Sequence, residues 1–184
     1  MRKIIPLIAL FLVASITFAQ AQDTGFDSSI TTDCIASLEL SDDAAQCIGQ
    51  SATACLTNEA DGVSSTLKQL CVFSELEEWQ KRLEVVYPAL LDHLQDQDDQ
   101  VLVWGWGQTS KAEALQNFDD AWYPNAEAEC RFEQSLWEGL EGRDDYLWCQ
   151  MKQTAEYVLL LETAIRDTCR HDHCQEEKYP KWPN

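Results

Sequence analysis

Basic residues are scarce in this sequence. It contains 13 lysines and arginines against 32 aspartates and glutamates, which gives a formal net charge of −19. A surface of this charge repels nucleic acids and anionic lipids, and it attracts cationic partners and speeds their encounter. We therefore expect no nucleic-acid partner. The acidity serves either solubility alone or the attraction of a basic protein.

Motifs of common enzymes and metal sites are also absent. No G-x-S-x-G, H-E-x-x-H or glycine-rich phosphate loop occurs. Among 32 acidic residues, paired carboxylates of the glycosidase type are expected by chance and indicate little. Residue types that bind zinc occur together near the C-terminus, at Cys169, His171, His173 and Cys174. Their spacing is not that of a usual zinc site, and a disulfide would compete for both thiols. We expect no enzymatic activity, no cofactor and no metal.

Only the N-terminus carries a long apolar run. Arg2 and Lys3 precede 15 almost wholly apolar residues (4–18), and residues 19–21 are the Ala-Gln-Ala pattern that signal peptidase reads. A membrane-spanning helix needs roughly 20 residues. We expect a signal peptide over residues 1–21, cleaved after Ala21. The remainder, 22–184, is expected to be a single helical domain with a short C-terminal tail, periplasmic or secreted and not inserted in a membrane, with a charge of −21.

The alternating pattern of β-strands is missing, and apolar residues instead recur every three or four positions, as in helices. We expect segment 22–29 to be loose and residues 58–65, 96–107 and 139–142 to be connections. The predicted helices run from Ser41 to about Leu56, from Ser65 or Thr66 to Leu94 with a kink at Pro88, from Thr109 or Ser110 towards Trp137 with a kink at Pro124, and from Asp144 or Asp145 to about Asp167. The predicted fold is all-α, a small kinked helical bundle cross-linked by disulfides.

Three blocks of apolar residues and cysteines lie between Cys71 and Leu161. The first places aromatic residues ahead of paired leucines: Trp79, Leu83, Tyr87, Leu90 and Leu91. The second is an alanine–tryptophan pair followed by a cysteine eight residues after the tryptophan: Ala121, Trp122 and Cys130. The third is a cysteine before a helix with a central threonine and a final leucine: Cys149, Thr154 and Leu161. Together the blocks resemble the bacterial LprI-type lysozyme inhibitor family.

The chain departs from that family at two places. Ala126-Glu127 stands where an Arg-Asp pair is usual, and Tyr157 stands where an arginine usually follows the threonine by three residues. The resemblance implies a periplasmic protein that binds and blocks a cationic wall-lytic enzyme such as lysozyme. The alternatives are a non-inhibitory envelope interaction or scaffold protein and a carboxylate hydrolase that acts on the cell wall.

All eight cysteines follow the predicted cleavage point, which is typical of a disulfide framework in an exported protein. The sequence alone does not choose among the many possible connectivities. Cys130 and Cys149 flank the connection at 139–142, and the resemblance favours the same pair. Joining Cys55 to Cys71 would close the turn at Asp61-Gly62. The remaining cysteines would then pair as Cys34–Cys47 and Cys169–Cys174.

One acidic and aromatic segment is a candidate contact for a partner. Its residues are Asp96, Asp98, Asp99, Trp104 and Trp106, the two tryptophans being next to glycines. Tryptophan is enriched at binding hot spots, and a loop flanked by acids suits a cationic cleft. The alternative, which we favour for the loop's apolar residues, is that the neighbouring valines and one tryptophan pack onto the core.

Overall fold

The computed structural model describes residues 25–38, 42–57, 64–102 and 109–172, and within these ranges it is all-α. The described residues form five α-helices and one 3-10 helix, without a strand. In chain order they are α1 (Ser29–Ser37), the 3-10 helix η1 (Asp42–Cys47), α2 (Gln50–Thr57), α3 (Ser65–Leu102), α4 (Lys111–Ser135) and α5 (Leu140–Asp172). The predicted fold class is confirmed.

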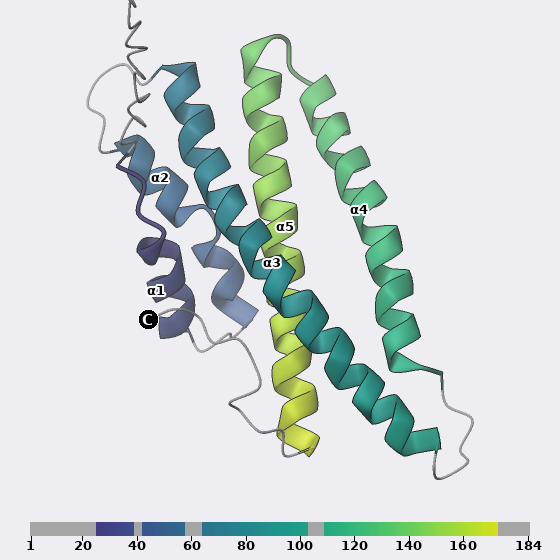
Figure 1. Ribbon diagram of the computed structural model, residues 1–184. Coiled ribbons are helices and arrows are strands. Elements are labelled where there is room, and N and C mark those ends of the chain that lie inside the picture. Colours follow the sequence, from purple (N-terminus) through teal and green to yellow (C-terminus); the bar gives the residue numbers. More distant parts are fainter. Residues whose placement is uncertain (1–24, 39–41, 58–63, 103–108, 173–184) are drawn as a thin grey trace, which may run out of the picture.

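Two long helices, α3 and α5, cross in the middle of the molecule, and the other elements pack against them (Figure 1). At one end, the first half of α3 and the first half of α5 pack with α1, η1 and α2 around buried residues that include Ile35, Leu76, Trp79 and Val158. At the other end, the second halves of α3 and α5 pack with the start of α4. Leu83 packs against both clusters, so the core is continuous along the bundle.

The apolar stripes predicted for α3 and α5 form this core. On α5 the predicted stripe comprises Leu147, Met151, Thr154, Val158, Leu161 and Ile165; Leu147 is half-buried and the other five are buried. On α3 the stripe continues past Pro88, which lies inside the helix and does not end it. A proline in a helix removes one backbone donor, and packing of the flanking residues holds the helix together across it.

Three predicted boundaries were wrong. The expected connection at 96–107 begins only after Leu102, because α3 continues through the acidic run, where Asp98 binds the start of α4. Helix α5 begins at Leu140 instead of Asp144, so Gly142 lies in its first turn. It also runs to Asp172, and Cys169 near its end packs against the core.

The expected helix from Ser41 to Leu56 is divided in two. Gly49 separates η1 from α2 with a positive φ of 84°, a conformation that favours glycine. A Cβ atom there would lie 2.8 Å from the ring of Trp148, so the site also lacks room for a side chain. Helix α1 is not among the predicted helices.

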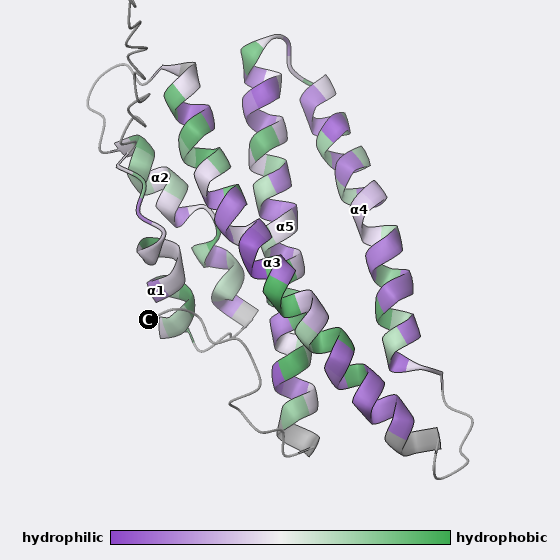
Figure 2. Ribbon diagram, in the orientation of Figure 1, coloured by the Kyte–Doolittle hydropathy of each residue, from purple (hydrophilic) through white to green (hydrophobic). Residues whose placement is uncertain are grey.

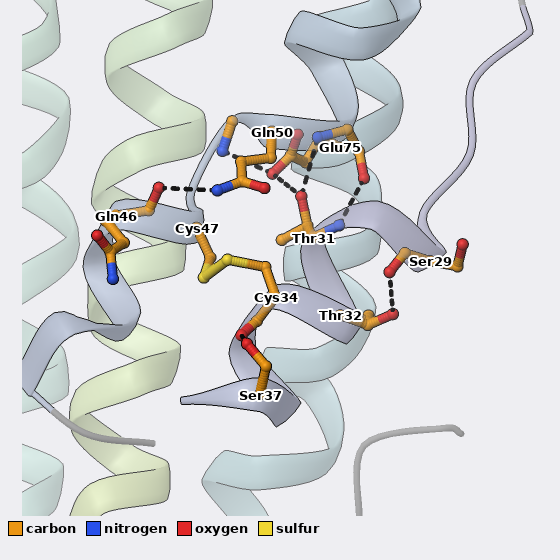
Figure 3. The surroundings of a disulfide bond; sticks show 11 residues. Ser29, Thr31, Thr32, Cys34, Ser37, Gln46, Cys47, Gln50 and Glu75 are labelled. Carbon is orange, nitrogen blue, oxygen red and sulfur yellow. Dashed lines mark hydrogen bonds between the residues drawn. A yellow bond between two sulfur atoms is a disulfide. The ribbon is translucent and has the colours of Figure 1, made fainter. Parts of the chain in front are cut away.

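A buried carboxylate joins these short N-terminal elements to α3. Glu75 is 1 % exposed, and its Oε1 accepts hydrogen bonds from the Thr31 hydroxyl at 3.0 Å and the Gly49 N–H at 2.8 Å. Its Oε2 accepts from the Ala52 N–H at 2.7 Å, and the Trp79 indole donates to Oε1 at 3.3 Å. Figure 3 shows Glu75 beside Thr31 and near the Cys34–Cys47 disulfide. One side chain therefore fixes α1, α2 and the turn before α2.

Three of the expected cysteine pairs are formed: Cys34–Cys47, Cys55–Cys71 and Cys130–Cys149. They join α1 to η1, α2 to α3, and α4 to α5. Cys169 is also disulfide-bonded, and Cys174, its predicted partner, lies outside the described residues. No helix in the described part of the chain is long and apolar enough to cross a membrane.

Candidate functional site

The predicted acidic contact residues lie on the last turns of α3. Asp96 and Asp99 are exposed and Asp98 is half-buried, while Trp104 and Trp106 lie outside the described residues. They remain a predicted contact for a partner.

Asp98 has a structural role at the start of α4. Its carboxylate accepts hydrogen bonds from the backbone N–H groups of Lys111 and Ala112, both at 3.0 Å, and from the Ser110 hydroxyl at 2.7 Å. Ser110 is itself the N-cap of α4 and accepts from the Glu113 N–H. These bonds, the one from Ala112 foremost, hold the pKa of Asp98 below its ordinary value. Asp98 thus satisfies donors that a helix N-terminus leaves unpaired.

The opposite end of α4 forms a helical hairpin with α5 that a disulfide cross-links. The Cys130–Cys149 disulfide crosses its stem. Beside it, the Glu127 carboxylate accepts from the Tyr146 hydroxyl and the Arg131 Nε, both at 2.7 Å. These bonds, first that of Tyr146, lower the pKa of Glu127. The Arg131 guanidinium also lies 4.4 Å from the Tyr146 ring centroid, so the stem is held by a covalent bond and a polar network.

Glycine makes the turn of this hairpin tight. Gly139 has a φ of 68° between the two helices. At Gly142 an added Cβ would meet the backbone oxygens of Gln134 at 2.6 Å and Trp137 at 2.9 Å. The first turn of α5 therefore packs directly on the backbone that ends α4. Any larger residue at position 142 would push the two helices apart.

Large apolar side chains are exposed around this turn. We call residues 132–142 the hairpin tip. Four of its side chains are more than half exposed: Phe132 (64 %), Leu136 (60 %), Trp137 (56 %) and Leu140 (57 %). Phe132 on α4 and Leu136, the C-cap of that helix, are four residues apart and therefore lie on one side of the helix end. In Figure 2 the first turn of α5 is green, whereas most of α4 is purple.

The hairpin tip is acidic as well as apolar. It contains Glu133, Glu138 and Glu141 and no basic residue. Glu138 and Glu141 are exposed, Glu133 is half-buried, and none of these carboxylates forms a hydrogen bond or ion pair with another described residue. The tip is not among the predicted site residues, because its residues were predicted to belong to a helix and a connection. The available signal was a cluster of apolar residues beside two glycines.

A hollow of about 380 Å³ lies at the other side of the bundle, between α1 and α3. Its lining includes Glu75, Trp79 and Arg82. Glu75 already accepts the bonds described above, and the Arg82 Nε forms a partly buried ion pair with Glu162 at 2.5 Å. Both charges are therefore used to hold helices together.

Both departures from the family pattern have structural partners. Tyr157 is buried, its ring stacks on Trp122 with 4.3 Å between centroids, and its hydroxyl donates to Asp119 at 2.7 Å. Burial, followed by that hydrogen bond, raises the pKa of Tyr157. Glu127, at the other departure, holds the hairpin stem. Tyr157 and Glu127, which stand where the family usually has other residues, therefore both stabilise contacts between helices.

Comparisons with known proteins identify the family. Neither the curated proteins nor the solved structures gave a match. The family model described as "Lysozyme inhibitor LprI" matches residues 43–161, more than half of the chain. This range spans all three blocks of the resemblance and the hairpin tip. The chain therefore belongs to the LprI lysozyme inhibitor family.

Proposed function

We propose that this protein binds and inhibits a cationic cell-wall lytic enzyme of the lysozyme class, outside the cytoplasm. The family match over residues 43–161 carries this proposal. The charge supports it, because 32 acidic residues against 13 basic ones create a field that steers a basic enzyme towards the protein.

The cysteines support the proposed compartment. Disulfides persist in oxidising surroundings such as the periplasm and the extracellular space and are rare in the cytosol. Three of them join neighbouring elements of this bundle. The N-terminal pattern that ends at Ala21 is the predicted route of export.

Inhibition by this protein requires binding energy and not catalysis. The polar networks of the described residues join one helix to another, whereas four large apolar side chains of the hairpin tip are more than half exposed. A rigid surface that combines apolar side chains with charges suits occupation of a complementary surface on an enzyme.

A wall-lysis assay tests the proposal. Suspended bacterial cell walls are cleared by a purified c-type lysozyme, and the rate of clearing is followed by turbidity at rising concentrations of this protein. We expect the rate to fall, and to fall more at low ionic strength, where charge attraction is less screened. A neutral globular protein at the same concentration serves as the control. Undiminished clearing at a molar excess over lysozyme refutes inhibition, and retention of lysozyme on the immobilised protein without inhibition would favour the envelope interaction role.

A further inference from the structure

We propose that the hairpin tip is the surface that docks onto the cationic enzyme, an inference that rests on the proposed function. The occupant is a basic protein with a partly apolar cleft or surface hollow. The tip would supply the apolar contacts at the centre of the interface and the glutamates at its rim. Three sets of observations on the described residues carry this assignment.

The apolar surface of the tip is concentrated. Four large side chains, each more than half exposed, lie within nine residues of sequence. Since a large aromatic side chain has about 150–250 Å² to bury, the exposed parts of Phe132 and Trp137 alone offer roughly 240 Å². That is almost a third of the about 800 Å² that one partner buries in a standard interface, before the two leucines are added. Trp137 is the residue type most enriched among binding hot spots.

The charge of the tip selects the kind of partner. Glu133, Glu138 and Glu141 have no internal partner among the described residues, and no basic residue lies within 132–142. Two basic residues flank the tip: Arg131 is already bonded to Glu127, and Arg143 is exposed, so the three carboxylates outnumber the one flanking cation that is not bonded to a described carboxylate. A basic partner would meet these carboxylates favourably. A second copy of the chain would bring like charges together, which opposes self-association through this surface.

The tip is held rigid before it binds. The Cys130–Cys149 disulfide, the Glu127–Tyr146 bond and the close packing at Gly142 fix the two helices directly behind it. A preorganised surface loses less conformational entropy on binding than a flexible one. The free energy of the apolar contacts is then available for affinity.

Substitution of exposed apolar residues tests the location. The double variant Leu136→Ser/Trp137→Ala removes two tip side chains. The control Tyr123→Ala/Leu160→Ser removes an aromatic and a leucine that are 68 % and 51 % exposed elsewhere on α4 and α5. Affinity for a c-type lysozyme is measured by calorimetry on the full mature proteins, after circular dichroism melts show that they fold. We expect the tip variant to raise Kd at least tenfold and the control to change it less than about twofold.

Removing acidic side chains tests the same location through the rate of association with lysozyme. Glu138→Gln/Glu141→Gln and Glu84→Gln/Asp92→Asn remove the same net charge, the first pair from the tip and the second from exposed positions on α3. We expect the tip pair to slow association with lysozyme several-fold at low salt, and the α3 pair to slow it less. Cytochrome c, a basic protein without wall activity, is the control for attraction by charge alone.

The outcomes separate the surface from the function. If wild-type protein inhibits lysozyme and the tip variants bind it as tightly and as fast as their controls, the assignment of the surface is overturned and the proposed function stands. If the tip variants change only sedimentation of the protein alone, the tip is a contact between copies and the assignment is again overturned. If the wild-type chain neither binds nor inhibits lysozyme, both proposals fall.

Discussion

Replacing Glu75 by glutamine isolates the carboxylate that joins α1 and α2 to α3. The substitution preserves the size of the side chain and replaces one of the two acceptor oxygens by an NH₂ group. If that group takes the place of Oε2, it faces the Ala52 N–H, which lies 2.7 Å from the carboxylate oxygen. Two donors would then face each other in a buried site, where neither has water as a partner.

The expected loss follows from these contacts. A buried donor left without an acceptor costs about 1–3 kcal/mol, so the Ala52 N–H and the new amide together predict a loss of about 2–6 kcal/mol. With a slope of about 2 kcal/mol per molar urea, the unfolding midpoint should fall by about 1–3 M. The measurement is urea unfolding followed by circular dichroism with the disulfides intact.

Glu77→Gln is the matched control. Glu77 lies on the same helix, two residues away, and is exposed. Surface substitutions of this kind change stability by about 0.5 kcal/mol or less. Equal midpoints for the two variants would refute the reasoning, because they would show that the four bonds to Glu75 are not what holds the N-terminal elements in place.

Three further predictions concern the rest of the bundle. Asp98→Asn should cost about 1–2 kcal/mol in urea unfolding, because α4 loses the carboxylate that accepts its N-terminal donors. Because the folded pKa of Asp98 lies below 3.8, its stabilisation is present above that pH and is lost as the pH falls through the lowered pKa, so the variant and the wild type should converge in acid. Glu162→Gln should lower the free energy of unfolding by about 3 kcal/mol, because it removes the carboxylate that pairs with the largely buried Arg82 guanidinium; an unchanged midpoint would contradict this. Replacing both Cys130 and Cys149 by serine should cost about 3 kcal/mol for a 19-residue separation and should increase amide hydrogen exchange at the hairpin stem; unchanged exchange there would show that the disulfide does not hold it.

The sequence predicted the central packing well because the apolar stripe is a direct physical signal. Residues recurring every three or four positions on α3 and α5 had to face a core, and Leu76, Leu90 and Val158 do. The cysteine pairs could be predicted for a related reason. Each expected pair among the described residues joins elements that are adjacent in sequence.

The misplaced boundaries depend on contacts that no local pattern contains. The acidic run at the end of α3 has the composition of a loop, yet Asp98 lies on a helix because it binds donors 12 to 14 residues further along the chain. Gly49 divides a helical pattern because Trp148, distant in sequence, occupies the space that a Cβ would need. Helix α1 was missed because Thr31 finds its partners on α2 and α3.

The hairpin tip was missed for the opposite reason. Phe132, Leu136 and Trp137 were expected within or at the end of a helix, and apolar residues in such a position are usually assigned to a core. Only the three-dimensional structure shows that α5 turns back so tightly, at Gly142, that these side chains stay outside. Their exposure is the basis for assigning the tip as a contact surface.

The most direct test of the central claim, that this protein binds a lysozyme and blocks it, uses a small neutral substrate. Cell walls are anionic and attract lysozyme, so an acidic protein could slow wall lysis by competing for the enzyme's charge. Hydrolysis of a soluble, uncharged chitooligosaccharide avoids that competition. The account predicts that hydrolysis falls as the protein is added and levels off near one protein per lysozyme. Full hydrolysis at a tenfold molar excess would contradict it.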